Sequence, residues 1–223
     1  MKKRWVLLKA KMEIIIIGAG GHAKVVAEAW KSKNETINGF YDDNSSLHGR
    51  TVLGHPVLGN SDAIKDLAPN KLLLGLGIGE NKSRCEYFDK FSSLGFSFPV
   101  IAHEDCSVSP TASISSGVVL FAQSVVNANA RIAEAVIINS GAIVEHDCEI
   151  GRGAHIAPGS VLAGGVSIGE FSFIGMGSVV KEGIKIGRNC IIGAGSVVLD
   201  DLPDDVVAVG VPAKIIKKLG RPN

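Results

Sequence analysis

The sequence has 223 residues, of which 46% are hydrophobic and 20% are charged, and its formal net charge is +1. This length allows one or two domains, each with a core of its own. Because the charges nearly cancel, nothing indicates a nucleic acid or an anionic membrane as a partner. There are 27 glycines and only 5% aromatic residues, which predicts many tight turns around small aliphatic side chains.

Residues 1–11 begin with a basic run and a short apolar stretch, as a signal peptide does. Lys9, Lys11 and Glu13 interrupt that stretch before it reaches the roughly 7 to 15 apolar residues of a signal-peptide core. No apolar run approaches the roughly 20 residues of a membrane span. We interpret residues 1–11 as a leader ahead of a second possible start at Met12, and we expect a cytoplasmic protein.

The N-terminal part has the pattern of a small α/β unit. Three apolar runs, residues 14–17, 37–41 and 72–76, predict buried strands. Residues 23–33 predict a helix after the first strand, and a second predicted helix carries Arg84. We read the order as β-α-β-α-β, which favours a parallel sheet.

A glycine-rich loop follows the first predicted strand. Gly18, Gly20 and Ala23 have the spacing of a loose dinucleotide fingerprint, and Asp42 and Asp43 end the second strand. The unit has only about 90 residues, enough for one mononucleotide-binding half. We expect the loop and the following helix N-terminus to hold the phosphates of a nucleotide-linked ligand, with the two aspartates accepting from its hydroxyls or amine. The alternative is a loop that only makes a turn.

The second half of the chain repeats every six residues. An aliphatic residue occupies sixteen successive sixth positions from Val108 to Val198, and the position four residues later is small or β-branched. A period of six fits neither a helix nor a simple strand. It predicts a solenoid of very short strands, with the aliphatic side chains inside and the small residues at the corners.

This pattern resembles that of the hexapeptide-repeat transferases. The resemblance implies that three hexapeptides form one triangular, left-handed coil, so that residues 108–203 supply a little over five coils. Residues 210–214, Gly-Val-Pro-Ala-Lys, match the usual ending of these acyltransferases. The predicted fold is therefore a small α/β parallel-sheet domain, half-Rossmann-like, at residues 12–100, followed by a left-handed parallel β-helix at residues 101–216.

The repeat also accounts for the cysteines. Cys106, Cys148 and Cys190 lie 42 residues apart, and no cysteine pair has the CxxC spacing. All three fall on the small inward position, but seven hexapeptides are not a whole number of coils. We expect them on three different faces, as reduced structural thiols that bind no metal, like Cys85.

The order of the two parts narrows the resemblance. A short α/β unit with Ile-x-Gly-Ala-Gly-Gly-His at residues 16–22, followed by a β-helix, resembles the family of sialic-acid O-acetyltransferases and bacterial sugar N-acetyltransferases, including bacillosamine-pathway enzymes. The resemblance implies that the first domain holds a nucleotide-linked amino sugar. It also implies that the β-helix binds acetyl-CoA between the subunits of a homotrimer.

Acyl transfer needs a base for the acceptor, and histidine is the natural base near neutral pH. His146 follows the inward Val144 by two residues, so it should lie outside the β-helix, and the residues one coil away, Ala128 and Gly164, are small. In the resembled family, Glu-His followed by an acidic residue carries the catalytic histidine. That match makes His146 the base and Asp147 the residue that orients or tunes it. The alternative is a solvated surface histidine.

The resemblance assigns further residues to the two ligands. It implies that His155 contacts the acetyl-CoA thioester or supports the site, and that Met176 and Ala194 lie beside the coenzyme through their backbones. The residues that it places on the nucleotide-linked sugar are Gly20, Gly21, His22 and Gly79. No cysteine or serine is placed as a nucleophile, which favours direct transfer within a ternary complex.

Four functions are compatible with these features. The preferred one is N-acetylation of the 4-amino group of a nucleotide-linked 4-amino-6-deoxyhexose by acetyl-CoA. O-acetylation of sialic acid or a related sugar is the second, since an amine and a hydroxyl both need a base. A non-catalytic β-helical scaffold is the third. The fourth is a metal enzyme of the γ-carbonic-anhydrase type, which needs three histidines where the repeat offers only His146 and His155.

Overall fold

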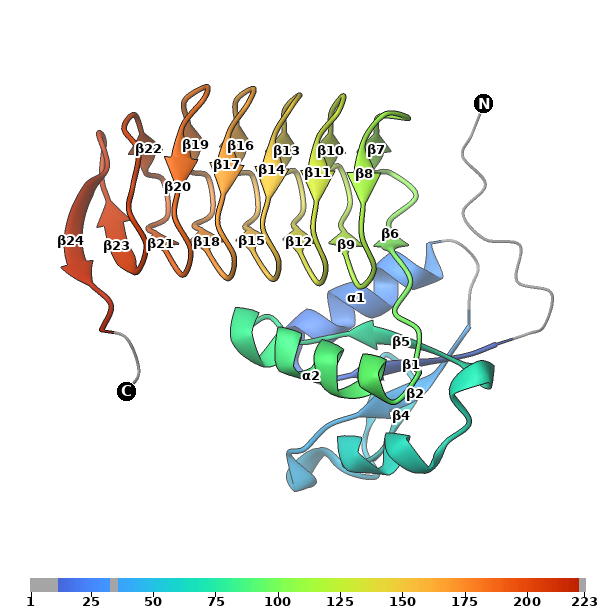
Figure 1. The fold of residues 1–223 in the computed structure, drawn as a ribbon. Helices are drawn as coiled ribbons and strands as arrows, with labels where there is room; N and C mark the ends of the chain where they lie inside the picture. Colours follow the sequence, from blue (N-terminus) through green and yellow to red (C-terminus); the bar gives the residue numbers. More distant parts are fainter. Residues whose placement is uncertain (1–11, 33–35, 221–223) are drawn as a thin grey trace. The chain divides into compact units, whose positions relative to one another are not determined.

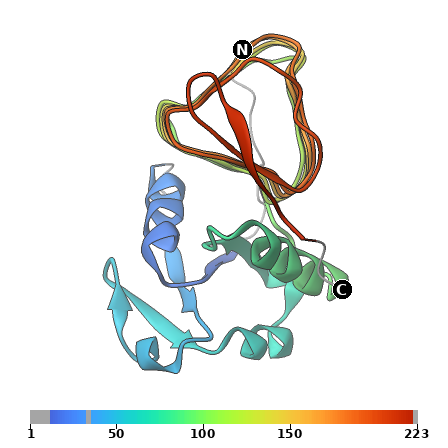
Figure 2. The same cartoon turned by 90° about the vertical axis from the view of Figure 1, so that its left-hand side faces the viewer.

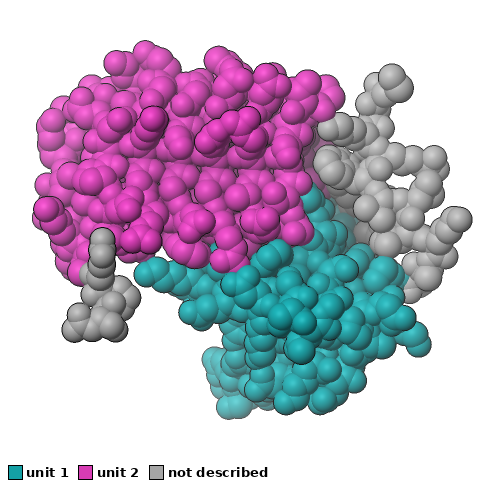
Figure 3. All heavy atoms as spheres, in the orientation of Figure 1, with its two compact units in different colours: residues 1–101 teal, residues 102–223 magenta. Residues whose placement is uncertain are grey.

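The computed structural model describes residues 12–32 and 36–220. It forms two compact units, which divide between Ile101 and Ala102 (Figure 3). The proposed leader, residues 1–11, lies outside the described residues. Neither of the two α-helices in the described part has the length and apolar character that a membrane span requires.

A five-stranded sheet forms the centre of the first unit, in the order β3-β4-β2-β1-β5 (Figure 1). The strands are β1 (Glu13–Ile17), β2 (Ile37–Tyr41), β3 (Thr51–Val52), β4 (His55–Gly59) and β5 (Leu72–Leu76). β3 is antiparallel to β4, and the other pairings are parallel. The four isoleucines of β1 are at most 2% exposed, as expected for a central strand buried on both faces.

Both predicted helices are present, but the predicted order β-α-β-α-β is wrong, because the described residues between the second and third predicted strands form no α-helix. The helices are α1 (Gly21–Lys31) and α2 (Asn81–Ser93). Between β2 and β5 the chain forms the β3–β4 hairpin and short 3-10 helices at Ser45–Leu47, Ser61–Asp66 and Pro69–Lys71 in place of an α-helix. The physical reason is local, since this segment carries Gly49, Gly54, Pro56, Gly59 and Pro69, which break helices and favour turns.

The second unit is a left-handed parallel β-helix. Two-residue strands recur every six residues, and each pairs with the strands 18 residues before and after it, as Val125 does with Ser107 and Ile143. Three parallel sheets result, and the coils superpose in a triangular outline (Figure 2). The strands are β6 (Ile101–Ala102), β7 (Ser107–Val108), β8 (Ser113–Ile114), β9 (Val119–Leu120), β10 (Val125–Val126), β11 (Arg131–Ile132), β12 (Ile137–Ile138), β13 (Ile143–Val144), β14 (Glu149–Ile150), β15 (His155–Ile156), β16 (Val161–Leu162), β17 (Ser167–Ile168), β18 (Phe173–Ile174), β19 (Val179–Val180), β20 (Lys185–Ile186), β21 (Ile191–Ile192) and β22 (Val197–Val198).

The interior of the β-helix follows the predicted repeat. The sixth-position aliphatics from Leu120 to Val198 are at most 2% exposed, and only Val108 and Ile114, at the open first coil, are partly exposed. The small positions are also buried. The hydroxyls of Ser160, Ser172 and Ser178 donate to carbonyls of the next coil at 2.7 to 2.9 Å, so these buried polar groups are satisfied.

The cysteines of the repeat lie on three different sheets. Cys106, Cys148 and Cys190 precede β7, β14 and β21, which belong to the six-, five- and eight-stranded sheets. Cys148 and Cys190 are fully buried, whereas Cys106, on the first coil, is only partly buried. Burial raises the pKa of the Cys148 and Cys190 thiols, which keeps them protonated and unreactive.

An antiparallel pair closes the eight-stranded sheet. β23 (Val206–Val209) continues the sheet in parallel with β21, and β24 (Lys214–Lys218) turns back along β23. All five residues of β24 are exposed. Its three lysines protect this edge against pairing with other chains.

Candidate active site

His146 lies on one of the three kinds of corner in the β-helix. These corners, here called the His146 corners, connect strands of the six-stranded sheet to strands of the five-stranded sheet, at residues 109–112, 127–130, 145–148, 163–166 and 181–184. From the second of these corners onward the third residue has positive φ: 59° at Asn129, 59° at Asp147, 68° at Gly165 and 71° at Gly183. Asparagine, aspartate and glycine are the residues that tolerate this conformation, which explains their presence here.

Successive corners are fixed to one another by the backbone. The Asp147 N–H donates to the Ala128 carbonyl at 2.9 Å, and the Gly165 N–H donates to the His146 carbonyl at 2.9 Å. The backbone that carries His146 and Asp147 is therefore held by the coils before and after it.

His146 and Asp147 form a pair. The imidazole Nδ1 lies 2.8 Å from Asp147 Oδ2, and the two side chains are 62% and 59% exposed. The His146 side chain thus lies outside the wall, where the register places it. Hydrogen bonds from His146 and then from Asn129 lower the pKa of Asp147, so its carboxylate is ionised at neutral pH. With Nδ1–H donated to that carboxylate, the Nε2 lone pair is directed away from Asp147 and can accept a proton.

The His146 imidazole lies where the side chain of residue 164 would be if that residue were not glycine. A Cβ on Gly164 would lie 2.5 Å from His146 Cε1 and 2.6 Å from Nε2. Any residue larger than glycine at position 164 would displace the ring, because contacts this short do not occur between real atoms. Gly164 therefore defines where the ring sits.

His155 is placed differently, in a strand and largely enclosed. It lies in β15, is 8% exposed and packs edge-on against Phe173 with ring centroids 5.1 Å apart. Its Nε2 lies 2.9 Å from the Asn139 side-chain nitrogen. The ring is thus fixed within the eight-stranded sheet, and its contact with acetyl-CoA remains a prediction.

Met176 and Ala194 share another kind of corner, which follows the strands of the eight-stranded sheet. They lie one coil apart, and the Gly195 N–H donates to the Met176 carbonyl at 2.8 Å, as the Gly177 N–H does to Pro158 at 2.9 Å. Met176 is 58% exposed and Ala194 is exposed. The structure therefore brings these two predicted coenzyme contacts into one column next to β15, which carries His155.

In the first unit, the predicted ligand residues gather around the start of α1. Gly20 is the N-cap of α1, and a Cβ on Gly20 or Gly21 would meet nothing within 4 Å. A Cβ on Gly79 would lie 3.8 Å from His22 Cγ, so the loop after β5 runs beside that histidine. Free space next to a helix N-terminus is what a phosphate group needs.

His22 is neutral at physiological pH. Burial, and then the charge of Arg84, lower its pKa to about 4. Arg84 is fully buried and donates to the Gly79 carbonyl at 2.9 Å, and burial lowers the pKa of Arg84 itself to about 10. The arginine thus holds the loop that borders His22, a role that the sequence pattern did not show.

The two aspartates bind the protein itself. Asp42 accepts from the Ala19 N–H at 2.7 Å and from the Asn44 N–H at 2.8 Å. Asp43 accepts from the Ser61 N–H at 2.9 Å and from the Tyr87 hydroxyl. Asp42 therefore fixes the glycine loop, and a direct contact between either aspartate and a ligand remains a prediction.

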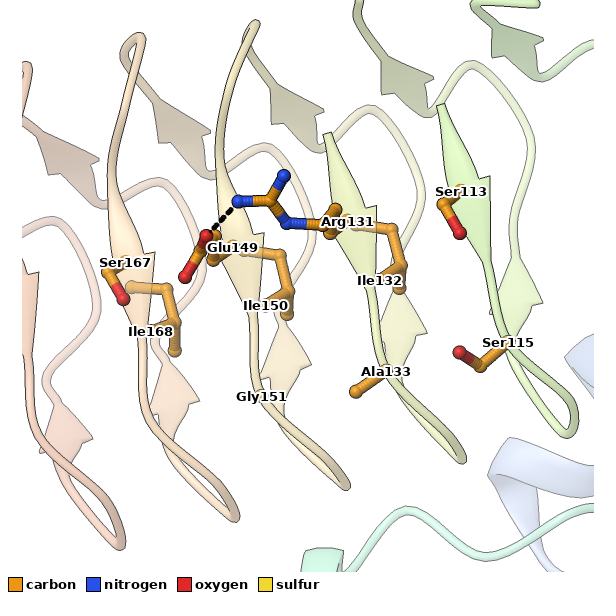
Figure 4. Close-up of a pocket in the computed structure, with 10 residues that line it drawn as sticks. All are labelled: Ser113, Ser115, Arg131, Ile132, Ala133, Glu149, Ile150, Gly151, Ser167 and Ile168. Carbon is orange, nitrogen blue, oxygen red and sulfur yellow. Dashed lines mark hydrogen bonds and ion pairs between the residues drawn. The ribbon is translucent and has the colours of Figure 1, made fainter. Parts of the chain in front are cut away.

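An open groove of about 420 Å³ runs along the five-stranded sheet (Figure 4). Ser113, Arg131, Glu149 and Ser167 stand in a row along it, and Arg131 forms an ion pair with Glu149. The charge of Arg131 also helps to lower the pKa of Asp147. Each residue of this row directly follows one of the His146 corners in the sequence, and Glu149 comes two residues after Asp147.

The comparisons with known proteins agree with this description. Residues 13–91 match the model of the PglD N-terminal domain, and residues 129–164 and 165–200 match that of the bacterial transferase hexapeptide. PerB from Caulobacter crescentus, in complex with CoA and GDP-perosamine, is 42% identical over 93% of this chain and 99% of its own, with a TM-score of 0.88. No curated protein sequence matches.

Two other solved structures are similar. A variant of the GDP-perosamine N-acetyltransferase from Caulobacter crescentus, with one histidine replaced by alanine, is 42% identical over 94% of this chain and 99% of that one, with a TM-score of 0.89. The acetyltransferase domain of PglB from Neisseria gonorrhoeae, in complex with acetyl coenzyme A, is 35% identical over 93% of this chain and 100% of that one, with a TM-score of 0.88.

The fold and the paired histidine on its wall define a hexapeptide-repeat acyltransferase. The sequence identity to these solved structures, and the share of each chain that is covered, also show the family within this class. This chain belongs to the family of bacterial sugar N-acetyltransferases in which a PglD-type N-terminal domain precedes the hexapeptide repeats.

Proposed function

We propose that this protein is a cytoplasmic acetyltransferase that moves the acetyl group of acetyl-CoA to the 4-amino group of a nucleotide-linked 4-amino-6-deoxyhexose. The observation that carries the proposal is the contact of 2.8 Å between His146 Nδ1 and Asp147 Oδ2, beside the open position of Gly164. It occurs in a chain that is 42% identical to a structure containing CoA and GDP-perosamine.

The chemistry follows from the pair. His146 Nε2 takes a proton from the acceptor amine as the nitrogen attacks the thioester carbonyl. A C–N bond forms, and the tetrahedral intermediate collapses with cleavage of the C–S bond. The departing CoA thiolate then takes the proton from the imidazolium, and Asp147 stabilises the imidazolium while it carries the charge.

The two domains divide the binding. Residues 12–100 hold the nucleotide-linked sugar. The backbone of Gly20 and Gly21, at the N-terminus of α1, binds its phosphates. The other residues that contact this ligand are His22, Gly79, Asp42 and Asp43. Residues 101–216 bind acetyl-CoA, with His155, Met176 and Ala194 along the coenzyme. The neutral state of His22 supports its use as a hydrogen-bonding group, because a neutral imidazole both donates and accepts.

We further propose a homotrimer in which the active site lies between neighbouring copies. In the single chain, more than half of the His146 and Asp147 side chains is exposed. A general base works best where water is excluded and its partners are held in place. A second copy over the His146 corners would provide that enclosure.

The test uses the full-length protein. Thermal shift with UDP-, GDP- and dTDP-linked amino sugars identifies the nucleotide, and mass spectrometry then follows acetylation of the stabilising sugar by acetyl-CoA. We expect one nucleotide series to stabilise the protein and its sugar to gain an acetyl group on nitrogen. Stabilisation by free sialic acid alone, with acetylation on oxygen, would replace this proposal with the O-acetyltransferase; no acetylation of any sugar would support a scaffold.

A further inference from the structure

Asp147 is contacted from the coil before it. Asn129 occupies the equivalent corner position one coil earlier, and its side-chain nitrogen donates to Asp147 Oδ1 at 3.3 Å. His146 Nδ1 lies against the other oxygen, Oδ2. The carboxylate is therefore held by two different residues, one at each oxygen.

The backbone explains why the two side chains meet. Asn129 and Asp147 have the same φ of 59°, so their side chains leave the wall in the same direction, one coil apart. The Asn129 N–H also donates to Thr111 Oγ1 at 3.1 Å, which extends the column one coil further. On the other side of Asp147 the column ends in Gly165 and Gly183.

The corner conformation alone does not require an amide at position 129. Glycine serves the same backbone at positions 165 and 183. Polar side chains occur only on the side of the column that leads to the histidine–aspartate pair, and Asn129 is the one that reaches the carboxylate. A hydrogen bond to its second oxygen further restricts the rotation of an exposed carboxylate, and such rotation would turn Asp147 away from the imidazole.

We propose that Asn129 is a positioning residue for acetyl transfer: its amide fixes the Asp147 carboxylate, which in turn orients His146. This inference rests on the function proposed above. Asn129 acts through Asp147 and touches neither substrate. Arg131, on the strand after the same corner, adds a positive charge near the carboxylate but is itself paired with Glu149.

Asn129→Gly is the direct test, because glycine keeps the positive φ and removes the amide. We expect kcat to fall about threefold to tenfold, as for one lost orienting hydrogen bond, with KM for both substrates unchanged. Asn129→Asp, which has the same size but cannot donate to a carboxylate, should lose at least as much. Asn189→Gly is the matched control, since Asn189 also has positive φ, 52°, and donates to Asp205 at 2.7 Å on another kind of corner.

A double-mutant cycle separates positioning from a general effect on the fold. If Asn129 acts only through Asp147, then Asn129→Gly in an Asp147→Gly background causes no further loss of kcat. The inference would be overturned if the kcat losses of the two single variants multiplied in the double variant. It would also be overturned if the Asn129→Gly enzyme were as active as the Asn189→Gly enzyme. If the wild-type protein acetylates no nucleotide-linked sugar, the proposed function itself fails; if the wild type is active and His146→Ala is inactive while Asn129→Gly is fully active, only the role of Asn129 fails.

Discussion

Replacing Gly164 by alanine tests how the position of His146 is set. The new Cβ would lie 2.5 Å from His146 Cε1, whereas ordinary contact begins at 3.4 Å, so the ring must retreat by about 0.9 Å. The φ of Gly164 is not positive, and Ala128 occupies the equivalent position two coils earlier, so the backbone accepts alanine. Because the ring is 62% exposed, it can move outward, and the free energy of unfolding should change by no more than about 0.5 kcal/mol.

A displacement of this size removes the base from its working position. A misplacement of about 1 Å can cost about a hundredfold in rate, and we expect a loss of kcat of this order for Gly164→Ala, measured as release of the CoA thiol. Glu182→Ala, one coil further along the same column, is the control and should retain activity. A Gly164→Ala enzyme with full activity and an unchanged melting temperature would refute the idea that the empty position at Gly164 sets the imidazole.

Asp147→Asn keeps the size of the side chain but removes the charge that stabilises the imidazolium; kcat should fall about tenfold or more, and an unchanged kcat would remove Asp147 from the mechanism. His22 has a pKa of about 4 in the folded protein, against 6.5 for an ordinary histidine, so between these values only the unfolded chain binds the proton. Lowering the pH through this window should reduce the free energy of unfolding by about 3 kcal/mol in all, and urea denaturation of His22→Gln should lack this part of the slope. Ile156→Ala, inside the β-helix and fully buried, should cost about 2 to 5 kcal/mol of stability in the same experiment, and a much smaller loss would contradict the packed interior. Light scattering should give the mass of three chains, whereas a stable, active monomer would exclude a site shared between copies.

The β-helix could be predicted because its repeat is encoded at every sixth residue. Each inward position from Leu120 to Val198 is buried, as the period requires. The hairpin β3–β4 could not be predicted in the same way. It contains only short strands, β3 at Thr51–Val52 and β4 at His55–Gly59, too short to show a clear alternation.

The features of the site that follow from the six-residue repeat could be predicted from the sequence, whereas the hydrogen-bond partners of its side chains could not. Counting two residues from Val144 was enough to place His146 outside the wall. The spacing of one coil also links Asn129 to Asp147, but only the structure shows that the amide reaches the carboxylate. The position of Asp42 at the end of a strand predicts a ligand contact, but no sequence pattern shows that its two oxygens also accept from the protein's own backbone.

The role of His146 is tested most directly by comparing wild-type protein with His146→Ala in acetyl transfer from acetyl-CoA to the nucleotide-linked amino sugar that stabilises the fold. Both proteins should have the same melting temperature, because the side chain is largely exposed. We expect an acetylated amine with the wild type and, with the variant, a rate that is lower by about a hundredfold or more. Equal rates for the two proteins would contradict it.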